Sequence, residues 1–131
     1  MPYMKLMAID YGAKRVGVAS TDDSGEFALP RVVLQNNESL LDEVIKLIKE
    51  GKIEKVVVGD SKNLDGTPNL ISKDIHNFVE TLKSKGLDVV LHPEVYTSME
   101  ADRLQGQNNM RDASAAALIL KNYIDLQKNK N

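Results

Sequence analysis

Four acidic residues stand where a folded chain can bring carboxylates together. Asp10 and Asp60 directly follow short apolar runs, Glu94 comes three residues after another such run, and Asp112 opens the last helical pattern. Carboxylate oxygens suit hard divalent cations such as Mg²⁺, and two such ions about 4 Å apart can activate water against a phosphodiester. Carboxylates converging from separate elements would therefore form a metal-dependent nuclease site. The plainer alternative is that acids end strands because they suit loops, and that Asp112 is an N-cap.

Two spacings of apolar residues, one typical of strands and one typical of helices, define the elements that must position these acids. Alternating or continuous apolar runs predict five strands, at Lys5–Asp10, Arg15–Thr21, Ala28–Leu34, Lys55–Gly59 and Asp88–Leu91. Apolar residues at helical spacing predict four helices, from a Ser39 cap through Lys49, at Asn69–Lys85, at Thr97–Leu104 and at Asp112–Gln127. Polar loops are expected at Asp60–Pro68 and Gly106–Met110.

Glycine and proline residues mark the ends of these elements. Gly12 is expected to supply any positive φ in the first turn, Gly51 to end the first long helix in the C′ position, and Gly86 to stop the second. Pro30 lacks a backbone donor, which places the third strand at an edge of the sheet.

The order of elements predicts an α/β fold. Three meander strands followed by strand–helix alternation indicate a mixed sheet covered by helices. Right-handed crossovers give the strand order 3-2-1-4-5 with strand 2 antiparallel and helices on both faces. We expect residues 1–131 to form a single domain, with the tail 128–131 frayed. The reactive crevice of such a sheet lies outside the carboxyl ends of its parallel strands, which is where Asp10, Asp60 and Glu94 fall.

Four blocks of the sequence resemble the YqgF/RuvX family, whose members are described as Holliday junction resolvase-like proteins and as pre-16S rRNA nucleases. The blocks are AIDYGAKRVGVA at 8–19, VVVG with NLDGT at 56–67, Glu94 with TSMEA at 97–101, and DASAAALIL at 112–120. The likeness covers nearly the whole chain in the right order. It implies an RNase H-like fold in which Asp10, Glu94 and Asp112 are the catalytic acids and ligate Mg²⁺ or Mn²⁺.

Two blocks depart from the pattern of that family. After Val58-Gly59 the family usually has Leu-Pro-Leu, whereas this chain has Asp60-Ser61-Lys62. The third block commonly reads Asp-Glu-Arg, whereas here it is Pro93-Glu94-Val95. An acid is therefore missing beside Glu94, together with an arginine that would bind phosphate in bidentate fashion. We hypothesise that Asp60 partly replaces the missing acid as a metal ligand; the alternative is a loop Asp that starts a turn.

Further residues near the acids are candidates for substrate binding or are set aside. Lys14, Arg15 and Arg111 flank the acids and are candidates for phosphate contact, and Asn63, Asp65 and Gly66 for a loop over the site. For all six, a solvated side chain or a simple turn is an equal alternative. His76 is expected to be exposed. His92 is expected on the opposite face of its strand from Glu94 and is left out of the site.

Composition excludes several classes of protein. The 131 residues include 17 Lys and Arg against 19 Asp and Glu, for a net charge of −2, and no Cys. Disulfides, zinc–thiolate sites and thiol nucleophiles are therefore excluded. With no apolar run near the ~20 residues of a membrane span, a cytoplasmic protein is expected. The charge balance argues against a nucleic-acid coating protein and predicts weak, salt-sensitive binding that depends on metal.

These observations predict a metal-dependent nuclease with a two-metal mechanism, acting on structured nucleic acid. The residues do not separate precursor ribosomal RNA from branched DNA, or endonuclease from exonuclease activity. The ribosome is a further candidate partner, and the chain is expected to be a monomer or a homodimer. One alternative is a non-catalytic RNA- or ribosome-binding module with a degraded site. Another is half of an actin-like phosphate-binding protein, which the length of the chain argues against.

Overall fold

The computed structural model describes residues 4–61, 71–94 and 111–128. Its strands are β1 (Leu6–Tyr11), β2 (Arg15–Thr21), β3 (Ala28–Gln35), β4 (Lys55–Ser61) and β5 (Val89–Glu94). Its helices are α1 (Leu40–Glu50), α2 (Ser72–Ser84) and α4 (Arg111–Lys128). The predicted helix at Thr97–Leu104 and the predicted loop at Gly106–Met110 lie outside the described residues, as do positions 129–131 of the tail.

The sheet confirms the predicted order and directions. Its five strands are arranged β3-β2-β1-β4-β5. β2 is antiparallel to both β1 and β3, while β4 is parallel to β1 and β5 is parallel to β4. Pro30 lies on the edge strand β3 as expected, next to a register shift between Val18 and Ala19 of β2. Because the three parallel strands β1, β4 and β5 point the same way, their carboxyl ends share one edge of the molecule, and β1 is also the central strand of the whole sheet.

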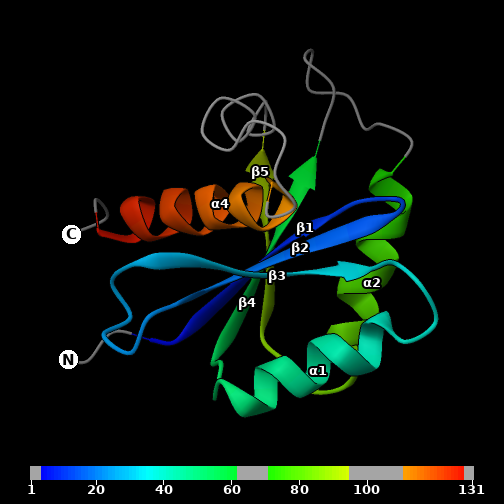
Figure 1. Ribbon diagram of the computed structural model, residues 1–131, viewed down its shortest axis with the longest axis horizontal. Helices are drawn as coiled ribbons and strands as arrows, with labels where there is room; N and C mark the ends of the chain where they lie inside the picture. Colours follow the sequence, from blue (N-terminus) through cyan, green and yellow to red (C-terminus); the bar gives the residue numbers. More distant parts are fainter. Residues whose placement is uncertain (1–3, 62–70, 95–110, 129–131) are drawn as a thin grey trace.

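Helices cover both faces of the sheet, as predicted. Figure 1 shows α4 on one face and α1 and α2 on the other. The cluster toward α1 and α2 includes Met7, Ile9, Val56, Val58 and Ile75. The cluster toward α4 includes Leu6, Ala8, Val57, Ile119 and Leu120. The two sets alternate along β1 and β4, because successive side chains of a strand point to opposite faces. This alternation decides which acids can meet.

Two strands run further than their hydrophobic patterns predict. β4 includes Asp60 and Ser61, which were expected in a loop, and β5 includes Pro93 and Glu94. The parallel ladder continues through the pairs Asp60 with Pro93 and Ser61 with Glu94. Hydrogen bonds between the main chains of two strands require no apolar side chain. The predicted strands, which ended where the apolar residues end, were therefore too short.

The ends of the helices differ in part from the caps expected from the sequence. Ser39 occupies the N-cap position of α1, but its side chain makes no capping hydrogen bond. Gly51 has φ −86°, and the left-handed residue after α1 is Lys52, with φ 53°. Gly86 has φ +86° and ends α2 as predicted. α2 begins at Ser72, later than the predicted Asn69, which lies outside the described residues.

Gly12 serves a purpose other than the expected positive φ. The described residues with positive φ are Gly25, Lys52 and Gly86. A Cβ at Gly12 would instead lie 2.5 Å from the carbonyl oxygen of Arg15. The turn between β1 and β2 is therefore too tight for a side chain at this position.

Candidate functional site

Asp10 lies at the carboxyl end of the central strand β1, on the face covered by α4. Leu6 and Ala8 share this face and pack against α4, and Asp10 follows two residues later. Its partner on β2 is Gly17. On the other side, Ile9 pairs with Val58, so that the next residue along β4 is Gly59. Residues without side chains thus flank Asp10 on both neighbouring strands, which leaves room beside its carboxylate.

The environment of Asp10 disfavours its negative charge. Burial, and secondly the charge of nearby Asp112, raise the pKa of the Asp10 carboxyl from 3.8 to about 6. Asp112 belongs to the first turn of α4, which is 102 positions further along the chain. The fold therefore brings together two of the four acids that the sequence singled out. A cation bound between two such carboxylates would offset both their repulsion and the burial of charge.

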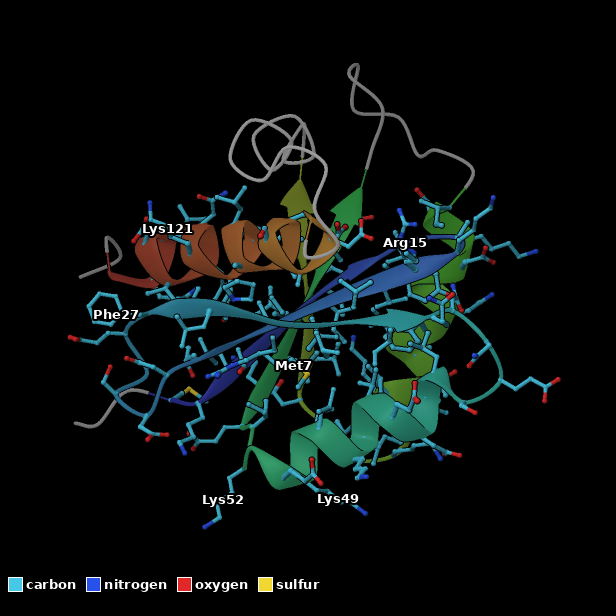
Figure 2. The ribbon with its side chains drawn as sticks, in the orientation of Figure 1. Met7, Arg15, Phe27, Lys49, Lys52 and Lys121 are labelled. Atoms are coloured by element: carbon cyan, nitrogen blue, oxygen red, sulfur yellow. The ribbon has the colours of Figure 1, made fainter. Side chains whose placement is uncertain are left out.

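Arg15 holds Asp112 in place. The Arg15 Nε donates a hydrogen bond of 2.8 Å to Oδ2 of Asp112, and the two groups form an ion pair. Figure 2 shows Arg15 at the end of the sheet where α4 begins. The Arg15 side chain remains 61% exposed. The sequence left two roles open for Arg15, phosphate contact and a solvated side chain. Because the guanidinium is directed toward the acids and remains exposed, it can contact a phosphate that approaches them.

Small residues let the start of α4 lie close to the sheet. Ala113 and Ala116 are fully buried, and Ala115 is nearly so. The backbone of Asp112 lies directly over Gly17 of β2. Sequence reasoning did not assign Gly17 a role, although it lies inside the first block of the resemblance. The signal that could have identified it is its position opposite Asp10 in the predicted hairpin.

Glu94 ends β5, and its side chain lies outside the described part of the structure. The preceding residues establish the face of this strand. The His92 ring meets the ring of Tyr123 on α4 edge-on, at a centroid distance of 6.0 Å. Residues i and i+2 of a regular strand share a face, so the alternation by which His92 was set apart from Glu94 does not follow. The side chain of Glu94 itself lies outside the described residues.

The structure places His92, which was left out of the site, on the face of the sheet that α4 covers, the same face as Asp10. Its ring is partly buried between the sheet and α4, and burial lowers its pKa below the usual value of 6.5.

Asp60 lies on the opposite face of the sheet from Asp10. The residue is only 8% exposed, and its Oδ1 is 3.7 Å from Nε2 of His76 on α2. His76 is exposed, as expected. Asp60 and Asp10 reach different faces because Asp60 follows Val58, which faces α1 and α2. The structure therefore does not bring Asp60 together with Asp10 and Asp112, contrary to the hypothesis that it replaces the missing acid.

The remaining substrate-binding candidates are placed only in part. Lys14 is exposed in the turn before β2, next to Arg15. Arg111 begins α4, but its side chain lies outside the described residues. Asn63, Asp65 and Gly66 also lie outside them.

The donor set of this site fits Mg²⁺ or Mn²⁺ in part. Asp10 and Asp112 supply hard carboxylate oxygens, and Mg²⁺ is commonly bound through one or two carboxylates plus substrate phosphates. Within the described residues, no group of three His, Cys, Asp or Glu side chains forms a complete ligand set. Beyond these two carboxylates, the sequence offers Glu94 as a further ligand, and its side chain lies outside the described residues.

The fold is that of RNase H-like resolvases. Thermus thermophilus RuvC superposes with a TM-score of 0.60 at 12% identity, over 96% of this chain and 97% of that one. A fowlpox virus Holliday junction resolvase superposes with a TM-score of 0.54 at 13% identity, over 94% and 99% of the two chains. These likenesses confirm the predicted class, a mixed five-stranded sheet with helices on both faces.

The chain belongs to the RuvX family, described as Holliday junction resolvase, whose profile matches residues 4–126. A protein of Nitratidesulfovibrio vulgaris named "Putative pre-16S rRNA nuclease" is 36% identical over 127 residues, which cover 95% of this chain and 86% of the relative. A protein of the same name from Thermoanaerobacter pseudethanolicus is 33% identical, over 97% of this chain and 100% of the relative. The resemblance predicted from the four sequence blocks is therefore confirmed. No helix in the described part of the chain is long and apolar enough to cross a membrane.

Proposed function

We propose that this chain is a metal-dependent nuclease that hydrolyses phosphodiester bonds of structured nucleic acid, with the 5′ end of precursor 16S ribosomal RNA as its substrate. The names of its relatives support the chemistry and the RNA substrate. A four-way DNA junction is the competing substrate, since the family is described by resolvase activity. The observation that carries the proposal is the partly buried Asp10 carboxylate, which lies beside Asp112 at the carboxyl end of the central parallel strand.

Each residue of the site has a distinct part in such a reaction. Bound Mg²⁺ or Mn²⁺ ions supply activation of the attacking water and stabilisation of the leaving oxygen. Asp10 and Asp112 present carboxylates from two elements, and Glu94 is the proposed third ligand. Because burial and repulsion disfavour the charge of Asp10, this carboxylate gains more from a cation than an exposed acid would. The reaction needs no protein nucleophile.

Arg15 joins the acids to the substrate in this scheme. Its Nε is committed to Asp112, and the exposed remainder of the guanidinium offers further donors to a phosphate. This role would partly offset the absence of the arginine that the family pattern leads one to expect after the third-block acid. The exposed Lys14 next to it adds a second cation.

Cleavage of end-labelled precursor 16S RNA in Mn²⁺ or in EDTA tests this proposal. We expect Asp10→Asn to lower the rate by about 100-fold or more, as is typical when one group that stabilises transition-state charge is removed. Asp125→Asn is the matched control, because it removes the same charge from an exposed position of α4 and leaves the site intact. A four-way DNA junction, assayed in parallel, shows which substrate has the larger kcat/KM.

A different pattern would contradict the proposal. If the protein binds the RNA but cleaves neither substrate in Mn²⁺ or Mg²⁺, it is a non-catalytic binding module. If Asp10→Asn cleaves as fast as Asp125→Asn, the activity does not arise at this site.

A further inference from the structure

We propose that Gly17 is a positioning residue of this site, because the absence of a side chain there lets the first turn of α4 lie on β2 and holds Asp112 beside Asp10. The inference rests on the proposed function, since it concerns how the metal-binding carboxylates are held together. Gly17 itself is not expected to contact metal or substrate.

The contact at Gly17 is one of backbone against backbone. A Cβ placed on Gly17 would overlap the carbonyl group of Asp112 and would lie 2.8 Å from the backbone nitrogen of Ala113. Ordinary contacts of a Cβ begin at 3.4 Å. No rotation of a side chain relieves such an overlap, because all three atoms belong to the main chain of α4. Even a single methyl group must therefore displace the start of the helix.

The direction of that displacement decides its effect on the site. Gly17 is the partner of Asp10 across the β1–β2 ladder, and the Asp10 side chain occupies the same face of the sheet as α4. A helix that is pushed off Gly17 therefore carries Asp112 away from Asp10. Ala113 and Ala116 of the first turns of α4 are also fully buried, and α4 packs on β2, so the helix has no free space into which it could shift sideways without disturbing this packing. A displacement on the order of 1 Å is large for a catalytic arrangement, where it can cost about 100-fold in rate.

Arg15 provides a readout of this geometry that needs no metal. Arg15 stands on β2, two residues before Gly17, and its Nε–H binds Oδ2 of Asp112. Moving Asp112 off β2 lengthens or breaks this bond. The resonance of the Arg15 Nε–H group therefore reports the position of Asp112 in the metal-free protein.

Gly17→Ala, compared with Gly51→Ala, tests the inference. Gly51 ends α1, and the nearest atom to a Cβ there is 3.2 Å away, so the control adds the same methyl group far from the acids and requires a shift of only a few tenths of an ångström, in place of the overlap at Gly17. For Gly17→Ala we expect a shifted Arg15 Nε–H resonance and Mn²⁺ binding weakened by about 10- to 100-fold in calorimetry with the metal alone. Gly51→Ala should match the wild type in both measurements.

A rescue variant separates positioning from general packing. Asp112→Glu adds one methylene, which extends the carboxylate back toward Asp10 when the helix has moved outward. We expect Gly17→Ala/Asp112→Glu to bind Mn²⁺ more tightly than Gly17→Ala, although Asp112→Glu alone weakens binding. A defect of packing alone would not be relieved by a longer acid, so the absence of rescue would overturn the inference.

The remaining outcomes are also decisive. If the wild type binds no Mn²⁺ and cleaves nothing, the proposed function fails, and the Arg15 resonance still shows whether Gly17 positions Asp112. If the wild type binds Mn²⁺ and Gly17→Ala binds it equally with an unshifted resonance, the inference fails while the proposed function stands. All samples contain trimethylamine N-oxide, which favours the folded state. If Gly17→Ala is unfolded even so, Gly17 serves stability and the inference is wrong.

Discussion

The negative charge of Asp10 lowers the stability of the folded protein. Its pKa is raised from 3.8 to about 6, first by burial and then by Asp112. A carboxyl whose pKa is higher in the folded state than in the unfolded state favours folding while it is protonated. This contribution is complete below about pH 3.8 and is lost as the pH rises through about 6. At neutral pH, without metal, the ionised Asp10 therefore destabilises the protein.

Asp10→Asn should for this reason stabilise the metal-free protein at neutral pH. A shift of about two pKa units corresponds to about 3 kcal/mol, which is an upper limit for the gain in the free energy of unfolding. We expect this gain above about pH 6.5 and little difference between the proteins near pH 4. Urea denaturation of both proteins in EDTA across this range measures it. Equal stabilities at every pH would show that the carboxyl of Asp10 is not buried.

At the scale of elements, α4 is the part of the fold that completes the site. It packs over β2, β1 and β3 and delivers Asp112 to the end of β1 where Asp10 stands. Its buried stripe includes Ile119 and Leu120, which meet Leu6, Ala8 and Val57 of the sheet. The position of Asp112 therefore depends on a hydrophobic contact that lies further along the same helix.

Ile119→Ala should accordingly destabilise the protein by about 2–5 kcal/mol, because it leaves a cavity between α4 and the sheet. Ile119 is 0% exposed, whereas Leu126 of the same helix is 52% exposed. Leu126→Ala, the matched control, should change the free energy of unfolding by no more than about 0.5 kcal/mol. Urea denaturation compares the two variants. Similar losses in both would mean that α4 does not pack through the face that carries Ile119.

At the scale of the whole molecule, the net charge of −2 does not describe where the individual positive charges lie. Arg15 and Lys14 lie at the end of the sheet that carries the acids. Arg31 lies at the other end, where it donates hydrogen bonds to Ser20 and to the carbonyl of Thr21 at the far end of β2. The affinity for nucleic acid should therefore depend on where each positive charge lies in the structure, rather than on the net charge of the chain.

Arg15→Gln and Arg31→Gln test this expectation, since both change the net charge equally. We expect Arg15→Gln to weaken binding of RNA to an Asp10→Asn background and to lower the salt dependence of log K by about 1. Arg31→Gln should leave both quantities nearly unchanged. Fluorescence anisotropy over a series of salt concentrations measures them. Equal effects of the two variants would indicate that binding follows the net charge alone.

The sequence predicted most of the sheet and part of the site. Strand order, strand directions and the placement of helices on both faces follow from periods of hydrophobicity and from the handedness of crossovers, which are regular along the chain. Asp10 and Asp112 were singled out because each adjoins an element whose pattern is clear. The ends of β4 and β5 were missed because pairing between main chains leaves no mark in composition.

By itself, the sequence determined which elements form and which acids lie at their ends, because the spacing of apolar residues that defines an element can be read from consecutive residues. Only the tertiary structure decided which of those acids meet. It placed Asp60 against His76 on one face and Asp10 near Asp112 on the other. It also joined Arg15 to Asp112 across 97 positions of the chain, and seated the backbone of Asp112 on Gly17. Such contacts depend on how elements distant in sequence pack, and a pattern along one segment holds no information about its distant neighbour.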